Sequence, residues 1–212
     1  MSKIALTEDQ VMSALNKCYE AALNGLPNTP NCYEIADQYL NKYGDAEKAV
    51  ASFVKWQIMK CSTSGFITSL GGILTLPVAI PANLASVWYI QLRMIATIAV
   101  LAGYDPSDDE VQTMAYICLT GASVSKICRE AGVQFTNKFT ISMIKKIPGE
   151  VLTKINQKVG QRFITKFGTK GIINLGKMVP FVGGLVGAGF DFVGTSAIAA
   201  KSQDVFFKGI LD

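Results

Sequence analysis

The chain has 212 residues and a net charge of +4; half of its residues are apolar and 17% are charged. Ordinary soluble domains carry about a quarter charged residues, so either the core is large or part of the surface faces something apolar. Histidine is absent, which excludes His-based catalytic triads and every zinc site that needs a histidine ligand. The length fits one domain with a substantial core.

Cysteine usage and the N-terminus bear on the cellular compartment. The five cysteines are widely spaced and form no C-x-x-C motif, so we expect reduced, buried thiols. Glu8 and Asp9 stand where a signal peptide would need an apolar stretch, so we expect no Sec-type export. The sequence therefore predicts a protein of a reducing, cytoplasmic compartment.

Three helices are predicted in the first sixty residues. Residues 7–10 match a capping box, and apolar residues follow at helical spacing until Gly25. A second helix is expected from Thr29 to Gly44, and Asp45 is expected to begin a third.

The centre of the sequence is a long stretch without charged residues. Residues 61–92 include no charged residue, and a run of this length would normally indicate a transmembrane helix. However, Pro77 and Pro81 divide it, and several glycines loosen its first half. We therefore predict a small-residue helix up to Leu76 and a long helix at about 81–102.

The second half of the sequence predicts three more helices. Ser107 opens a second capping box, and the helix that follows is expected to run towards Gly132. After Gly149, an apolar row and a basic row both step by four residues, which predicts an amphipathic cationic helix. The last apolar block, residues 178–200, is expected to be followed by a short helix at 201–211.

These elements together predict the fold class. Period-two alternation is not sustained anywhere, so no sheet is expected. We predict an all-α fold: a compact multi-helix bundle with two Gly/Pro-interrupted apolar central helices. Residues 1–45 are expected to form an N-terminal helical extension and residues 46–212 the main helical domain, unless the two form one continuous domain.

Arg93, in the predicted central helix, is the arginine that we expect to be buried. Asn83 and Thr97 share its face at helical spacing. Burying an arginine is costly unless it is paired, and Asp191, the only charge in the last apolar block, is the natural partner. Asn83, Arg93 and Asp191 therefore form a candidate binding set for a headgroup or another acidic ligand. The alternative is a structural ion pair that sets helix register.

The basic part of the sequence indicates an anionic partner. Residues 126–177 hold eleven Lys or Arg and only two acids. The basic row of the amphipathic helix consists of Lys154, Lys158, Arg162, Lys166 and Lys170. Such a helix suits an anionic membrane surface; the alternative is a solvated lysine face on a helix docked to the core. Nucleic acid is not expected as a partner, because this section offers only Phe for stacking.

No other pattern predicts catalysis, a metal or a cofactor. The glycines at 183–189 follow no strand and precede no Lys-Ser/Thr, so close helix packing explains them better than phosphate binding. The acids at 105–110 lack calcium-loop spacing. Ser123 lacks the second glycine of a nucleophile elbow and has no histidine to activate it. We expect no catalytic residue, no metal and no cofactor.

Several short motifs stand in and around the two apolar blocks. They are Gly71-Gly72, Leu76-Pro77, Pro81-Ala82-Asn83-Leu84, Gln91-Leu92-Arg93-Met94-Ile95, Gly103-Tyr104-Asp105, Val179-Pro180-Phe181-Val182-Gly183-Gly184 and Phe190-Asp191. Together they resemble the EcsC family over roughly residues 46–200. The chain departs from the family at Asn83, where an acid is common, so a role for that acid does not carry over.

What this resemblance implies is limited. The family is helical and mostly bacterial, is named for its association with an ABC-transporter locus, and has no settled biochemical activity. The resemblance therefore implies intracellular, membrane-related work and supplies no catalytic residues.

Three functional hypotheses follow. The first is a non-enzymatic, membrane-associated helical protein, peripheral to the inner membrane, that binds anionic lipid or a membrane protein. The second is a soluble helical carrier or hydrolase with an internal pocket for an acidic lipid, in which Arg93 faces the carboxylate or phosphate. The third is a pore-forming effector, favoured only by the uncharged length.

Overall fold

The computed structural model describes residues 6–61, 80, 82–133, 140–167 and 184–211, with the side chains at 60–61, 82–83, 141, 166–167 and 184–193 left out of the description. Every regular element in these ranges is an α-helix, which confirms the all-α prediction for this part of the chain. In chain order the helices are α1 (Glu8–Asn24), α2 (Cys32–Tyr43), α3 (Ala46–Cys61), α5 (Ala82–Leu101), α6 (Asp109–Thr120), α7 (Val124–Glu130), α8 (Ile141–Ile144), α9 (Gly149–Phe167) and α11 (Gly184–Phe206).

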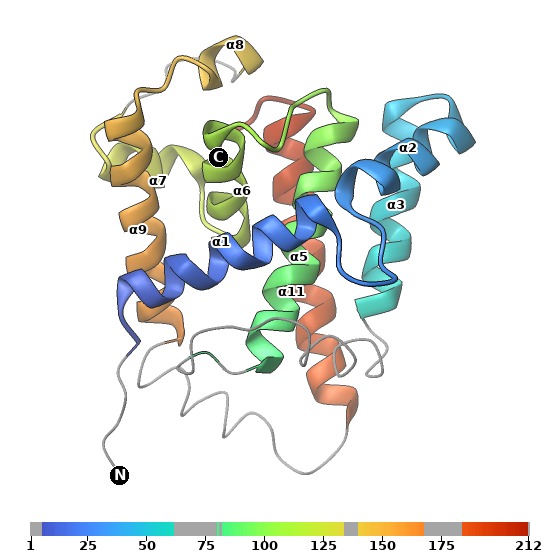
Figure 1. Ribbon diagram of the computed structural model, residues 1–212, viewed down its shortest axis with the longest axis horizontal. Coiled ribbons are helices and arrows are strands. Elements are labelled where there is room, and N and C mark those ends of the chain that lie inside the picture. The colour runs from blue at the N-terminus through green and yellow to red at the C-terminus, as the bar shows by residue number, and fades with distance from the viewer. Residues whose placement is uncertain (1–5, 62–79, 81, 134–139, 168–183, 212) are drawn as a thin grey trace.

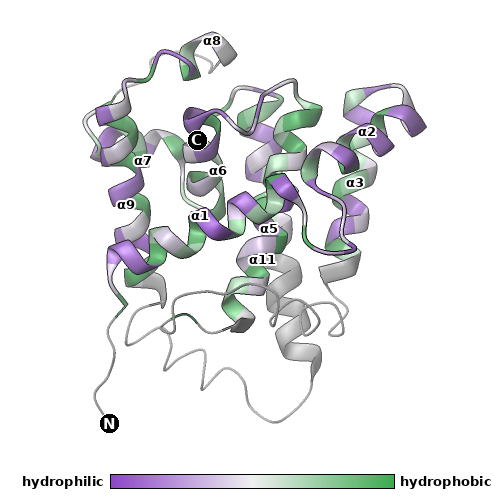
Figure 2. Ribbon diagram, viewed as in Figure 1, coloured by the Kyte–Doolittle hydropathy of each residue, from purple (hydrophilic) through white to green (hydrophobic). Residues whose placement is uncertain are grey.

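Helix α5 is the centre of the bundle. It contacts α1, α2, α3, α6 and α11, and it is mainly hydrophobic, whereas hydrophilic residues are frequent on α2 and α9 (Figure 2). Its window Leu84–Leu101 is long and apolar enough to cross a bilayer, with a mean hydropathy of 1.6, but 83% of that window is buried inside the protein. An apolar surface on all sides is typical of a core helix as well as of a membrane span. Here it forms the core.

The other helices form two flanks around α5. Helices α2 and α3 lie on one side, and α7, α8 and α9 lie on the opposite side (Figure 1). Helix α1 crosses in front of α5 and contacts both α2 and α9. Its Tyr19 hydroxyl donates to the carbonyl of Pro106 at 2.8 Å. The N-terminal helices and the rest of the chain thus share one hydrophobic core.

Side-chain caps define the first three helices. The predicted capping box at Thr7 is confirmed, because its hydroxyl accepts from the Gln10 backbone N–H while the Gln10 side chain accepts from the Thr7 N–H. Asp45 accepts from the Lys48 N–H, as expected for the start of α3. The start predicted for the second helix was wrong: its N-cap is Asn31, and the Thr29 hydroxyl closes the preceding turn.

Two boundaries in the middle of the chain differ from the prediction. Ser107 does not cap a helix, because its hydroxyl and its N–H both donate to the Asp105 carboxylate; the N-cap of α6 is Asp108, without a side-chain cap bond. The helix predicted to run to Gly132 is broken at Gly121, where φ is +72°. Ser123 then caps α7 by accepting from the Lys126 N–H at 3.2 Å.

The ends of the two apolar blocks are only partly described. The central helix has the predicted extent, and Gly103, with φ of +85°, follows its end. The separate helix predicted at 201–211 was wrong, because α11 continues through Lys201 to Phe206 without a breaking residue. The helix predicted up to Leu76 and the glycine step at Gly183 lie outside the described residues.

Candidate functional site

Helix α9 confirms the predicted amphipathic helix and shows where its apolar row lies. Ile155, Val159 and Phe163 are all buried, and α9 contacts α1, α6 and α7. The Phe163 ring meets the Trp88 ring of α5 edge to face at 5.2 Å. The apolar face of α9 is therefore part of the protein core and is not exposed for insertion into lipid.

The basic row of α9 has three described side chains with different environments. Lys154 is exposed, and Lys158 is half-buried with its Nζ 3.4 Å from Gln161 Oε1. The Arg162 side chain turns towards α7, where it pairs with Glu130. The side chain of Lys166 and the whole of Lys170 lie outside the described residues.

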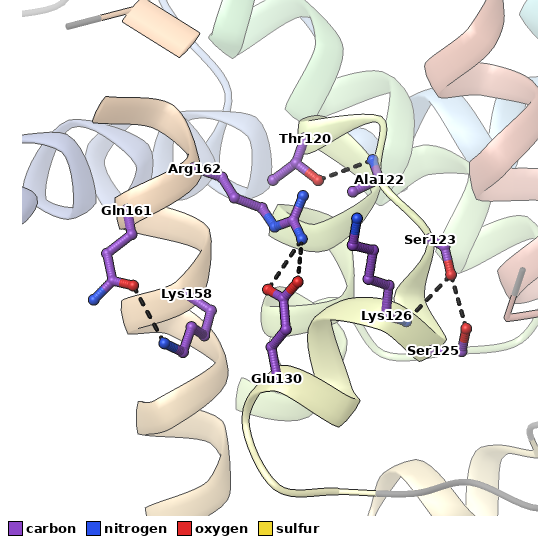
Figure 3. Close-up of polar contacts among 9 residues, drawn as sticks. All are labelled: Thr120, Ala122, Ser123, Ser125, Lys126, Glu130, Lys158, Gln161 and Arg162. Carbon is purple, nitrogen blue, oxygen red and sulfur yellow. Dashed lines mark hydrogen bonds and ion pairs between the residues drawn. The ribbon is translucent and has the colours of Figure 1, made fainter. Parts of the chain in front are cut away.

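Arg162 forms an ion pair across the gap between α9 and α7. Its Nη2 donates to both carboxylate oxygens of Glu130, at 2.9 and 3.0 Å (Figure 3). The Arg162 side chain is 29% exposed and that of Glu130 is 40% exposed. Arg162 Nε, in contrast, is buried and has no hydrogen-bond partner. An unpaired buried N–H of a cation is costly unless a ligand or water accepts from it.

A pocket of about 270 Å³ opens beside this guanidinium. It is lined by Thr120 at the end of α6 and by Arg162, Phe163 and Thr165 of α9. Both threonine hydroxyls already donate to backbone carbonyls within their own helices, at 2.7 and 2.9 Å. Among the described lining residues, the hydrogen-bond donors that remain for a ligand therefore belong to Arg162.

A second cation approaches the same place from α7. Lys126 and Glu130 are four residues apart and so lie on one face of the helix. Figure 3 shows the Lys126 side chain beside the Arg162–Glu130 pair, with Lys158 on the other side of that pair. Lys126 is exposed and forms no ion pair with any carboxylate that the structure describes. Arg162 itself lines the pocket, and Glu130 and Lys126 are its charged neighbours on α7.

The flanks of the fold differ in charge. The described residues 124–133 and 140–167, which contain α7, α8 and α9, hold eight basic and two acidic residues. Residues 32–61, which form α2 and α3 on the opposite side, hold four of each. The fold therefore gathers the positive charge of the sequence on one flank.

Arg93 lies apart from this flank, in the core. It is 5% exposed, and its Nη1 donates to the Pro30 carbonyl at 3.3 Å and to the Tyr89 hydroxyl at 3.4 Å. The guanidinium carbon is 5.3 Å from the centre of the Tyr89 ring. The neighbouring Thr97 hydroxyl donates to the Arg93 carbonyl and not to a ligand position. Arg93 therefore ties α5 to the chain between α1 and α2.

The remaining members of the predicted Arg93 set are not described. Asn83 stands in the first turn of α5 and Asp191 in α11, but both side chains lie outside the described residues, so the predicted pair stays a prediction. Helix α11 approaches α5 through Gln91, whose side-chain amide donates to the Thr195 hydroxyl at 3.3 Å. Gln91 and Arg93 are two positions apart on α5, and residues at that spacing point about 200° apart around the helix axis. The Arg93 side chain therefore leaves α5 on a different face from Gln91.

The cysteines fit the thiol prediction where they are described. Cys18, Cys32, Cys118 and Cys128 are free and buried, and burial raises the pKa of each thiol to about 12. Such thiols are poor nucleophiles at neutral pH. In the described part of the chain, no three His, Cys, Asp or Glu residues are grouped so that they could hold a metal ion.

Sequence reasoning missed several members of the Arg162 site. Glu130, Lys126, Thr120 and Thr165 come from three helices, and the order of residues does not reveal that these helices meet. The one available signal was that Glu130 is one of two acids in a strongly basic section.

Comparison with known proteins identifies a family and nothing closer. The model of the EcsC protein family matches residues 5–208, nearly the whole chain. No curated protein and no solved structure matches the chain.

Proposed function

The chain belongs to the EcsC protein family, and from the charge distribution of its fold we propose that it is a non-enzymatic protein that attaches peripherally to anionic lipid surfaces. The α7–α9 flank, defined as the described residues 124–133 and 140–167, would contact the lipid headgroups. A cytoplasmic location at the inner membrane is part of the proposal.

The separation of charge between the two flanks is the observation that carries this proposal. Each Lys or Arg near an anionic membrane contributes about 1 kcal/mol of attraction. Eight basic residues against two acids on one flank therefore favour one orientation, while the balanced α2–α3 flank gives no comparable attraction.

The contact would be electrostatic and would not require refolding. The apolar row of α9 is buried against the core, so laying that row on a bilayer would first expose core residues such as Phe163 and Trp88. Burial of a large aromatic side chain contributes about 1.5–3 kcal/mol, which opposes such a rearrangement. The exposed basic residues are available as the protein stands.

An enclosed carrier for whole lipids has less support. The Arg162 pocket, at about 270 Å³, is smaller than the roughly 300–1,000 Å³ typical of pockets that bury drug-sized ligands. It has room for a headgroup and not for acyl chains.

Vesicle co-sedimentation tests the proposal. The full chain should pellet with vesicles that contain phosphatidylglycerol and remain in the supernatant with pure phosphatidylcholine. Binding should fall steeply between low and high salt, because surface charge interactions are screened within about 10 Å at 0.1 M ionic strength. Equal binding to neutral vesicles, or salt-independent binding, would contradict an electrostatic contact.

Matched charge reversals test the orientation. The double variant K154E/K158E should lose at least about tenfold in vesicle affinity, since two attractive charges become repulsive. The double variant K42E/K48E makes the same change in net charge on the α2–α3 flank and should bind much more like the wild type. Equal losses in both variants would show that only net charge matters and would overturn the proposed orientation.

A further inference from the structure

The Arg162 pocket has cationic donors that the fold does not use. Glu130 accepts only from Nη2 of the guanidinium, and Nε is buried without a partner. The side chain is 29% exposed, and it lines the pocket. The guanidinium thus remains able to donate to a further acceptor.

The chemistry of the lining selects an anion. The Thr120 hydroxyl donates to the Ile117 carbonyl and accepts from the Ala122 N–H, and the Thr165 hydroxyl donates to the Gln161 carbonyl. Because a hydroxyl has one proton, neither can donate to a ligand without breaking its present bond. Among the described lining residues, Arg162 therefore supplies the donors for a ligand, and the Lys126 side chain lies beside it (Figure 3).

We infer that this pocket binds a phosphate group, with Arg162 and Lys126 as its cationic ligands. Two cations match the charge of about −1.5 to −2 that a phosphomonoester carries near pH 7. The planar guanidinium suits bidentate contact with phosphate oxygens. Phe163 gives the pocket an apolar wall against which the carbon attached to the phosphate can lie.

Glu130 sets the affinity of the site. It is negative and already shares the guanidinium, so it competes with an incoming phosphate. The inference deepens the proposed function, because the phosphate of an anionic lipid headgroup is one source of this ligand; free phosphate is the other.

A titration in solution tests the site without any membrane. Inorganic phosphate and glycerol 3-phosphate are titrated into the full chain at constant ionic strength, and binding is followed by calorimetry or by NMR. R162Q should weaken phosphate binding by about tenfold or more, because a charge-assisted bidentate contact is lost. K126Q should also weaken it, and R162K should give an intermediate affinity.

Two matched variants separate local contact from net charge. K158Q removes the same charge from the same helix, but Lys158 lies on the other side of the guanidinium from Lys126 (Figure 3), so its phosphate affinity should stay within about twofold of wild type. E130Q should tighten binding by freeing Nη2, and E150Q, an equal change of charge in the first turn of α9, should tighten it less. Thermal melting of each variant establishes that it is folded.

The source of the phosphate is decided with vesicles. Phosphatidic acid vesicles are compared with phosphatidylserine vesicles of matched surface potential. A preference for phosphatidic acid that disappears in R162Q identifies the lipid headgroup. Phosphate binding in solution without such a preference identifies free phosphate. Both results support the site.

The inference is overturned if phosphate does not bind in solution, or if R162Q and K158Q have equal effects. The proposed function can still hold in that case, because vesicle binding that is lost in K154E/K158E does not depend on the pocket. Conversely, phosphate binding by a chain that ignores anionic vesicles would retain the site and remove the membrane role.

Discussion

Arg93 and Arg162 sit in two regions of the same bundle and use their guanidinium groups in different ways. Arg93 is 5% exposed, and its Nη1 donates to a backbone carbonyl and a tyrosine hydroxyl. Arg162 is 29% exposed, pairs with Glu130 through one nitrogen and lies beside a pocket with its Nε unpaired.

Depth of burial alone therefore does not indicate which arginine is available to a ligand. A buried cation held by neutral acceptors can act as a structural tie, because its contacts are made within the fold. A partly exposed guanidinium that still has unpaired N–H donors is available to a ligand. Changes near Arg93 should therefore affect stability, and changes at Arg162 should affect binding.

The largest expected effect is a loss of stability at alkaline pH, caused by the buried cysteine thiols. Burial raises the pKa of Cys18, Cys32, Cys118 and Cys128 from the ordinary 9.0 to about 12. The folded state thus keeps these thiols protonated while the unfolded chain loses their protons near pH 9. Their contribution to stability is complete below about pH 9 and is lost as the pH rises towards about 12.

Urea unfolding between pH 8 and 11 measures this loss. In the variant C32A, the dependence of stability on pH above 9 should become shallower by about 1.4 kcal/mol per pH unit, because one proton fewer is involved. Parallel pH profiles for C32A and the wild type would mean that the Cys32 thiol is not in a dry environment.

Truncation of Arg93 should give the next largest effect. R93A should lower the free energy of unfolding by roughly 2–4 kcal/mol, since it leaves a cavity and leaves the Pro30 carbonyl without its donor. Urea denaturation measures the loss, and Y89F, which removes one hydroxyl and keeps the guanidinium, should cost about 1 kcal/mol. Wild-type stability in R93A would contradict the structural role.

A double-mutant cycle with D191N tests the ion pair that the sequence predicts. Arg93 leaves α5 towards Pro30 while α11 approaches on the face of Gln91, so the effects of R93A and D191N should add within about 0.5 kcal/mol. A coupling energy well above that would establish the pair instead.

The stability effect at Arg162 should be small. R162Q breaks an ion pair whose two side chains are 29% and 40% exposed, and such pairs contribute up to about 1 kcal/mol. The melting temperature should therefore stay close to that of the wild type while phosphate binding falls. A loss of stability as large as that of R93A would place Arg162 among the structural residues.

The smallest expected effect is at the two exposed apolar side chains of α3. Trp56 and Met59 are 49% and 51% exposed and lie on the α2–α3 flank, away from the proposed lipid contact. Addition of anionic vesicles should leave the emission of Trp56 unchanged, which is obtained as the difference between the wild type and W56F. Trp88, at 2% exposure, is the buried reference. A blue shift that W56F abolishes would mean that α3 enters the lipid.

Local sequence signals predicted much of the fold. Helical spacing identified α9, and short-range caps identified the starts at Thr7 and Asp45, because these interactions lie within four residues of the chain. The same reasoning failed at Ser107, whose hydroxyl binds Asp105, and at Gly121, whose positive φ ends α6. At both places a local alternative to the helix was favoured.

The candidate site was less predictable than the fold. The basic row was visible in the sequence, but the partner of Arg162 is Glu130, 32 residues earlier, and the pocket includes Thr120 from a third helix. Arg93 was recognised as interior, and among the described residues its hydrogen-bond partners are the Pro30 carbonyl and the Tyr89 hydroxyl. Every residue has a backbone carbonyl, so no sequence pattern marks the contact with Pro30.

Lysine footprinting on vesicles tests attachment through the α7–α9 flank. The full chain is acylated with an amine-reactive reagent, free and bound to phosphatidylglycerol vesicles, and each lysine is quantified by mass spectrometry. If the protein attaches through the α7–α9 flank, Lys126, Lys154 and Lys158 should be protected, while the labelling of Lys42 and Lys48 should stay unchanged. Protection of Lys42 and Lys48, or identical labelling in both states, would contradict attachment through the α7–α9 flank.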